Sequence, residues 1–309
     1  MLSDRPFRFG VQLRGATSGQ EWRAKCRRAE ALGYDTLAVA DHFPRGLGPF
    51  AALATAVAAT DRIRVGAFVF ANDFRHPAVL AKEAATLDLL SDGRLEVGIG
   101  AGWLRAEYEA TGIPFDRAGV RIERLAEAIP LIKRLWTEDN VTAQGRFYQA
   151  TDLTIAPRPV QAPHPPVMVG GGGQRVLSLA ARHAEIVALN PRATPVGTPD
   201  RRDITAEATA RKLAWVREAA GARFPDLELN IIALRVVTTA DRAATAHQLA
   251  QELGLTPDEV LASPHVLLGS AEEMADTLRQ RRDRYGISYI TVTEDGLEPF
   301  APVMERLAT

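Results

Sequence analysis

The sequence predicts one domain, residues 1–309, folded as a (β/α)8 barrel with insertion loops at its C-terminal face. Apolar, strand-like runs alternate with helical patterns along the chain, and this alternation yields eight strands. Runs such as Arg64 to Phe70 and Val167 to Val169 are apolar on both faces, which is typical of parallel strands covered by helices. Repeated βα units in this number favour a closed barrel over an open doubly wound sheet.

The first half of the barrel is expected within residues 7–136. Gly33 follows the first helix at the position where glycine commonly ends a helix. The expected strands are 7–13, 36–40, 63–71 and 94–100. The expected helices are 20–32, 49–59, 77–90 and 119–136.

The second half continues the same alternation. The expected strands are 167–170, 185–190, 227–238 and 287–293. The expected helices are 174–183, 204–220, 240–253, 270–285 and a last one from about Pro299.

Three segments interrupt the alternation. Residues 101–118 are expected to form a long loop, residues 141–149 a small hairpin, and residues 191–203 a loop rich in Pro, Arg and Thr. Loops of this length are uncommon inside a compact domain and are usually functional or disordered.

Composition narrows the classes of function. A formal charge of −1 offers no excess of basic residues for a nucleic-acid backbone, and no apolar run approaches the ~20 residues of a membrane span. Cys26 is the only cysteine, so an internal disulfide is impossible and a reducing cytoplasm is expected. Its helical spacing indicates a packing residue.

Active sites of such barrels lie at the carboxyl ends of the strands. The residues that follow the expected strands are Arg14, Asp41-His42-Phe43, Asn72 to His76, Gly100 to Trp103, Gly170 to Gln174, and Asn190.

The glycine run Gly170-Gly171-Gly172-Gly173 separates a buried strand from a helix that opens at Gln174-Arg175. Glycines let backbone N–H groups approach an anion, the helix N-terminus adds partial positive charge, and Arg175 adds a charged contact. A plain tight turn is the alternative. A dinucleotide site needs an acidic residue ~20 positions later, and Glu185 comes too early, so a single phosphate fits better.

Asp41-His42 follows the second strand, and the imidazole suits proton transfer beside a redox ring. The two side chains point to opposite faces, so Asp41 is not simply the partner of His42. A structural histidine is the alternative.

The small residues Gly100, Ala101 and Gly102 lie at the end of the fourth strand and leave room for a flat ligand, with Trp103 as a wall of the pocket. The alternative is that the glycines only ease the packing of the barrel.

Other chemistries lack their motifs. The chain has neither a His-Glu-x-x-His zinc motif nor a Gly-x-Ser-x-Gly nucleophile turn. Glu107 and Glu109 are interpreted as a solvated helix face rather than a hydrolytic pair.

An ordered set of motifs extends from Phe7 to Val292. It comprises Asp41-His42-Phe43, Gly66 through Arg75-His76-Pro77, Gly93 through Trp103, Tyr108 through Pro114, Pro166 through Gly173, and Gly269-Ser270. Together these motifs resemble the luciferase-like monooxygenase superfamily, and most of all its branch that uses the deazaflavin coenzyme F420.

The resemblance implies functional residues. His42 and Asp41 would lie beside the reactive ring as catalytic residues, and a cis peptide bond would join Phe68 and Val69 behind it. The coenzyme-binding residues implied are Asp41, Phe68, Val69, Asn72, Gly100, Ala101, Gly102, Gly170, Gly171, Gly172, Gly173, Gln174 and Arg175. The substrate pocket would hold Arg14, Phe43, Trp103 and Asn190, covered by loop 191–203. The sugar-phosphate dehydrogenases of this branch carry a catalytic Glu where Trp103 stands.

The resemblance also implies a function and partners. A deazaflavin transfers hydride and reacts poorly with oxygen, whereas FMN permits oxygen insertion. The expected function is F420-dependent hydride transfer to or from a small organic substrate whose identity is not indicated. The alternatives are a two-component FMN monooxygenase with a separate reductase and a non-catalytic flavin-binding paralogue. Relatives usually dimerise through the helices beside strands 2 to 4, so a homodimer is expected, without a metal ion.

Overall fold

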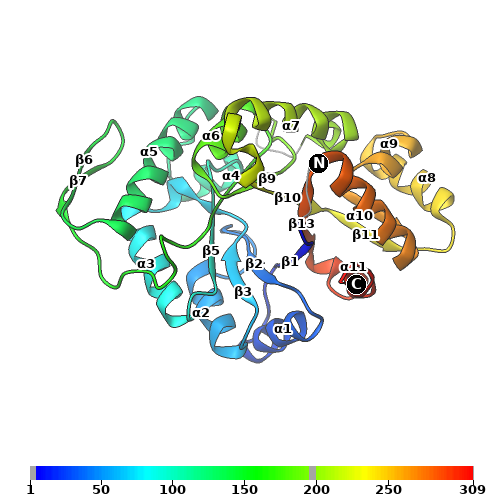
Figure 1. Ribbon diagram of the computed structural model, residues 1–309, viewed down its shortest axis with the longest axis horizontal. Coiled ribbons are helices and arrows are strands. Elements are labelled where there is room, and N and C mark those ends of the chain that lie inside the picture. The colour runs from blue at the N-terminus through cyan, green and yellow to red at the C-terminus, as the bar shows by residue number, and fades with distance from the viewer. Residues whose placement is uncertain (1–4, 195–199, 309) are drawn as a thin grey trace.

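The computed structural model describes residues 5–194 and 200–308, and it confirms the (β/α)8 barrel (Figure 1). β1 pairs with both β2 and β13, and β3 pairs with β5, which closes a ring of parallel strands. The barrel strands are β1 (Arg8–Leu13), β2 (Thr36–Val39), β3 (Arg64–Ala67), β5 (Leu95–Gly100), β8 (Val167–Gly171), β9 (Ile186–Leu189), β10 (Glu228–Ala233) and β13 (Ile287–Thr293).

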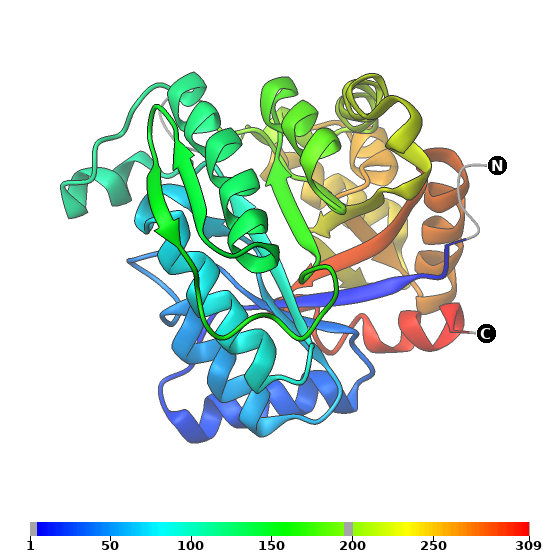
Figure 2. The same cartoon turned by 60° about the vertical axis from the view of Figure 1, so that its left-hand side comes forward.

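Helices surround this ring on the outside (Figures 1 and 2). They are α1 (Gly19–Ala31), α2 (Pro49–Ala59), α3 (Pro77–Leu90), α5 (Ala118–Thr137), α6 (Gln174–His183), α7 (Ala206–Ala220), α10 (Ala271–Tyr285) and α11 (Ala301–Leu307). Each buries an apolar stripe against the strands, as α1 does with Trp22, Cys26 and Ala29. Cys26 is fully buried, so its interpretation as a packing residue is confirmed.

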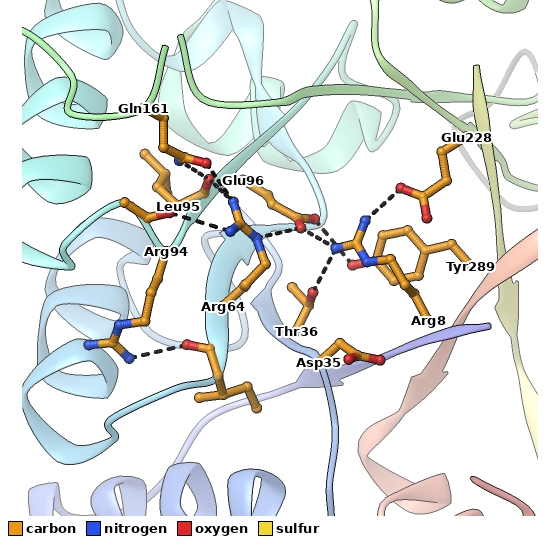
Figure 3. A network of polar contacts seen from close by, with 12 residues as sticks. Arg8, Asp35, Thr36, Arg64, Arg94, Leu95, Glu96, Gln161, Glu228 and Tyr289 are labelled. Carbon is orange, nitrogen blue, oxygen red and sulfur yellow. Dashed lines mark hydrogen bonds and ion pairs between the residues drawn. The ribbon is translucent and has the colours of Figure 1, made fainter. Parts of the chain in front are cut away.

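The N-terminal end of the barrel contains a network of charged side chains (Figure 3). Arg8, the first residue of β1, forms ion pairs with Glu96 and with Glu228, and Arg64 Nε lies 2.8 Å from Glu96 Oε1. The ring of Tyr289 lies under the Arg8 guanidinium, 4.4 Å from its centroid. These contacts occupy the end of the barrel opposite the strand carboxyl ends, so a ligand site belongs at the other end.

The expected strand 63–71 is interrupted. β3 ends at Ala67, the Phe68–Val69 peptide bond is cis, and β4 (Phe70–Ala71) then pairs with β5. The cis bond expected from the resemblance is therefore confirmed. The hairpin at 141–149 is also confirmed, as the antiparallel pair β6 (Val141–Gln144) and β7 (Gln149–Leu153).

The prediction of a single strand at 227–238 is wrong. β10 ends at Ala233, and β11 (Arg235–Thr238) leaves the barrel and pairs with β12 (Val266–Gly269), a strand that the sequence analysis missed. Leu234 N donates to His265 O at this branch point. With α8 (Arg242–Leu253) and α9 (Pro257–Ala262), these strands enclose a small apolar core of their own.

Two insertions frame the carboxyl ends of the strands. The expected loop 101–118 contains a helix, α4 (Arg105–Thr111), which ends at Gly112 with φ 72°. Loop 191–203 includes residues 195–199, which lie outside the described residues, and then the short 3-10 helix η2 (Arg201–Ile204).

Candidate active site at the carboxyl ends of the strands

His42 is held by a carboxylate from α4. Its Nδ1 lies 2.8 and 2.9 Å from the two carboxylate oxygens of Glu107, and the Phe43 amide donates to the same carboxylate at 3.0 Å. Within the described chain, Nε2 of His42 makes no hydrogen bond to protein. A carboxylate can only accept, so a neutral His42 keeps its proton on Nδ1 and presents Nε2 as an acceptor.

The interpretation of Glu107 as part of a solvated face is wrong. Glu107 is 4% exposed, because α4 folds back over the end of β2 and places this side chain beside His42. Glu109, two residues later, is 63% exposed and fits the solvated face. The signals available in the sequence were the pair Tyr108 and Thr111 at helical spacing and a glycine suited to a helix C-cap.

Trp103 also contacts His42. The two rings meet edge to face with centroids 5.7 Å apart. The predicted wall and the predicted proton carrier therefore lie together.

The Asp41 carboxylate binds other groups than those that contact His42. Its carboxylate accepts from both terminal nitrogens of Arg75, at 2.6 and 3.0 Å, and from the Ala71 amide at 3.0 Å. The His42 side chain instead contacts Glu107 and Trp103. The side chains of Asp41 and His42 thus diverge, and Asp41 joins β2 to the segment after β4.

The cis peptide Phe68–Val69 lies at the barrel interior. Gln12 Nε2 donates to Phe68 O at 2.7 Å, and the Phe68 side chain belongs to the interior cluster. A Cβ on Gly100 would lie 2.8 Å from Val69 Cγ2, and one on Gly170 would lie 3.2 Å from Val69 Cγ1. Val69 therefore fills the space that these two glycines leave, between β5 and β8.

The glycine run serves two purposes. A Cβ on Gly171 would lie 2.3 Å from Val176, and a Cβ on Gly172 would lie 2.4 Å from the backbone nitrogen of Arg192, so close packing requires both glycines. Gly173 differs, because an added Cβ meets no atom of residues 5–194 or 200–308 within 4 Å. Gly173 is also the N-cap of α6, and no side chain caps its amides. The open, uncapped helix start is the feature suited to an anion.

Arg175 forms an ion pair with the neighbouring helix α5. Its guanidinium is 62% exposed and pairs with Glu123 of α5 at 3.2 Å. Gln174 opens α6 itself.

The other predicted residues occupy distinct places. Asn72 is buried and donates to the Tyr148 hydroxyl at 2.9 Å, so it joins the barrel to the hairpin. Arg14 pairs with the exposed Asp295. Phe43 is 58% exposed, and its ring centroid lies 4.9 Å from that of Phe74.

The loop after β5 is held by the buried Arg121. Its guanidinium donates to Ala101 O at 3.2 Å and to Gly102 O at 3.3 Å.

A buried lysine anchors the loop after β9. Lys212 is fully buried, and its Nζ donates to Asn190 O at 2.9 Å and to Asp203 O at 2.8 Å. It also lies 2.7 Å from Asp203 Oδ2, which accepts from the Arg192 amide at 2.7 Å. Both ends of loop 191–203 are therefore tied to one cation. Asn190 Oδ1 is buried and has no hydrogen-bond partner among the residues that the structure describes.

The described residues lack two kinds of feature. No described helix has the length and hydropathy of a membrane span. Within 5–194 and 200–308, no group of three or more His, Cys, Asp or Glu side chains is arranged to hold a metal ion.

The chain is similar to a known protein family and to curated proteins. The family model described as luciferase-like monooxygenase matches residues 5–289. An F420-dependent glucose-6-phosphate dehydrogenase of Intrasporangium calvum is 40% identical over 168 residues, which cover 51% of this chain and 50% of the relative. An FMNH2-dependent dimethylsulfone monooxygenase of Pseudomonas putida is 31% identical over 191 residues, covering 61% and 52%. The chain thus spans about half the length of these curated relatives.

Solved structures support the same architecture. An F420-dependent secondary alcohol dehydrogenase, in complex with an F420–acetone adduct, superposes with a TM-score of 0.77. The match covers 98% of this chain and 99% of that one at 20% identity, a similarity that shows the fold.

Proposed function

The chain belongs to the luciferase-like monooxygenase family, and on this basis we propose that it is an F420-dependent oxidoreductase acting on a small organic substrate. When bound, the deazaflavin supplies a hydride donor or acceptor that reacts poorly with oxygen. The observation that carries the proposal is the pair of features at one end of the barrel: an uncapped helix start at Gly173 and an imidazole held by Glu107.

The helix start fits the coenzyme phosphate. Among the described residues, no atom fills the space beside Gly173 and no side chain caps the first amides of α6, and the helix dipole favours negative charge there. Gly172 brings the backbone of loop 191–203 close to the same point. We assign Gly170 to Gln174 as the phosphate-binding segment, with Arg175 at its edge because Glu123 already holds its guanidinium.

His42 is the proposed proton carrier. Glu107 fixes Nδ1, so Nε2 is the nitrogen that can take or give a proton at the substrate. Asp41 is assigned to positioning, since Arg75 and the Ala71 amide occupy its oxygens. Trp103 forms one wall beside His42. Phe43, Arg14 and Asn190 remain the proposed substrate-side residues, and Phe68, Val69, Asn72 and Gly100 to Gly102 the proposed surroundings of the ring.

The substrate class differs from that of the dehydrogenase relative. The resemblance assigns an acidic catalytic residue to the position of Trp103, and tryptophan cannot transfer a proton. We therefore propose that the substrate is not a sugar phosphate.

FMN is the second candidate cofactor, favoured by the similarity to the dimethylsulfone monooxygenase. Such an enzyme would need a separate reductase as partner. The purified protein should bind coenzyme F420 and leave oxygen consumption at the background rate, as followed by coenzyme absorbance and an oxygen electrode. Tight FMNH2 binding with oxygen uptake would instead assign a monooxygenase, and binding without turnover of any offered substrate would favour a non-catalytic paralogue.

A cytoplasmic location and a homodimer complete the proposal. The lone, buried Cys26 supports a reducing compartment. An apolar groove on α2 and α3 supports the dimer, because it lies on helices that follow β2 and β3.

A further inference from the structure

A cavity outside the barrel is lined by residues of α10, α8 and α9. These three helices lie on the right-hand side of Figure 1. Its volume is about 370 Å³, within the size range of small-ligand sites. Its polar lining residues include Arg242 from α8 and, from α10, Arg281, Arg284 and Tyr285. None of these residues belongs to the site proposed for the coenzyme.

Arg281 forms the floor of this cavity. It is 8% exposed, and its one hydrogen bond within the described chain is a long contact of 3.4 Å from Nη1 to Pro264 O. No carboxylate of the described residues lies within ion-pair distance of it. Arginine is rarely buried unless it is paired, since an isolated charge loses its hydration without compensation. Burial and the nearby Arg242 together lower the pKa of Arg281 to about 10.

Two further donors at the cavity lack acceptors. Arg242 Nε and the Tyr285 hydroxyl are both buried, and neither has a hydrogen-bond partner within residues 5–194 and 200–308. Arg242 makes only a long contact, 3.4 Å from Nη2 to the Thr277 hydroxyl. A buried donor without an acceptor is costly, so these two donors, beside an Arg281 guanidinium with a single long hydrogen bond, point to an absent acceptor.

Acidic residues at the rim do not supply that acceptor. Glu273 and Asp276 line the cavity, but both are exposed. Glu273 Oε2 accepts from the Ser270 amide at 2.7 Å, and Asp276 pairs with Arg279 at 2.8 Å. The positive charges of Arg281 and Arg242 are therefore not neutralised by these carboxylates. Arg284 adds a third guanidinium to the lining of the cavity.

We propose that this cavity binds a small phosphate ester, whose oxygens accept from the guanidinium groups of Arg281 and Arg242 and from the Tyr285 hydroxyl. A tetrahedral group carries several acceptor oxygens and matches donors that come from two helices. A monocarboxylate has only two oxygens. The cavity is also large enough to admit an organic substituent beside the phosphate.

Calorimetric titration with inorganic phosphate and with glycerol phosphate, at constant ionic strength, tests this site. Wild type should bind one more phosphate per chain than Arg281→Met. The matched control is Arg182→Met on α6, which removes one exposed charge and should titrate like wild type. Phosphate bound at the start of α6 would persist in all three proteins, so the two sites are separable. Identical titrations of wild type and Arg281→Met would overturn the site and leave the proposed coenzyme function untouched.

Two additional measurements guard against a folding artefact. In phosphate-free buffer Arg281→Met should melt above wild type, because it keeps the apolar stem and removes an unpaired charge. A lower melting temperature would contradict the unpaired state of Arg281. Tyr285→Phe removes only a hydroxyl and should weaken phosphate binding about 5-fold or more, in line with a hydrogen bond to a charged group. Unchanged affinity in that variant would exclude the hydroxyl from the site.

Discussion

At the scale of single residues, His42 and Glu107 form a hydrogen-bonded pair. Glu107 is buried, and both of its oxygens lie within 3 Å of His42 Nδ1. The same carboxylate accepts from the Phe43 amide, so the orientation of His42 depends on α4 as well as on β2.

Replacing His42 with Ala should lower kcat by roughly 10²-fold or more while coenzyme affinity changes little, as expected for loss of a proton carrier. Stopped-flow turnover and coenzyme titration measure the two quantities. Equal losses in both, or no loss, would return His42 to a structural role.

Glu107→Gln tests the positioning role. Glutamine retains the size of the side chain, but its amide can donate to Nδ1 and so favours the opposite tautomer of His42. We expect a fall in kcat of about 10²-fold, a changed pH profile of kcat, and little change in KM. Glu109→Gln, on the exposed side of α4, is the control and should retain wild-type activity. A Glu107→Gln enzyme with the wild-type pH profile would refute the tautomer argument.

Gly173→Ala separates ligand binding from stability. The added methyl meets no atom of the described chain within 4 Å, so the melting temperature should stay within a degree or two. The methyl projects beside the start of α6, where the phosphate is proposed to bind, and coenzyme affinity should fall about 10-fold or more, equivalent to ~1.4 kcal/mol. Gly172→Ala is the contrasting variant, since its methyl meets backbone at 2.4 Å and should lower the melting temperature itself. Unaltered coenzyme affinity in Gly173→Ala would place the phosphate elsewhere.

At the scale of elements, β12 and the loop after β9 depend on buried polar groups. His265 precedes β12 and is fully buried; its Nδ1 lies 2.8 Å from Ile232 O, and Nε2 has no partner. Lys212 ties Asn190 to Asp203. Both groups lie where the chain leaves the regular barrel.

Burial lowers the pKa of His265 from its ordinary 6.5 to about 3. The unfolded chain therefore binds a proton below pH 6.5 that the folded chain refuses until about pH 3, and stability falls as pH decreases through this window. Between pH 6.5 and 4.5 the loss from this group is about 2 kcal/mol. Urea unfolding of His265→Asn should show a pH dependence weaker by that amount, with the exposed His247→Asn as control. Parallel pH curves for wild type and His265→Asn would contradict this origin.

The sequence predicted the barrel because its strands are apolar on both faces and its helices carry apolar stripes, which are local patterns. It placed His42, Trp103 and the glycine run at strand ends for the same reason. It missed Glu107 because the partner of that carboxylate lies 65 residues earlier in the chain, a contact that only the folded topology creates. It missed β12 because a four-residue apolar run does not reveal whether the strand joins the barrel or a separate pair.

At the scale of the whole molecule, the charged network lies at one end of the barrel and the candidate site lies at the other. Residues of the first end are expected to affect stability, and residues of the second end are expected to affect function. Arg8, Glu96 and Glu228 lie at or near the N-terminal ends of their strands, remote in topology from the residues proposed to bind ligand. Burial raises the pKa of Glu228 even beside Arg8. Such an arrangement is common in barrels, where loops at the carboxyl ends vary around a fixed frame.

An apolar surface on α3 supports assembly into a homodimer. Val79, Leu89 and Leu90 are 50%, 44% and 62% exposed, and they account for three of the five large hydrophobic side chains that the described residues expose. A groove of about 760 Å³ runs between α2, α3 and the segment after β7. An apolar surface of this kind is a candidate interface, and a two-fold axis allows the same helix to contribute from both copies.

Leu90→Asp should therefore break the proposed dimer. Light scattering after size exclusion should give twice the chain mass of 33.5 kDa for wild type and the single-chain mass for Leu90→Asp, because a buried unpaired carboxylate opposes association. Phe43→Ser, which removes an exposed hydrophobic side chain after β2, is the matched control and should stay dimeric. A monomeric wild type at micromolar concentration would refute the interface. A Leu90→Asp protein that keeps the dimer mass would locate the interface on another face.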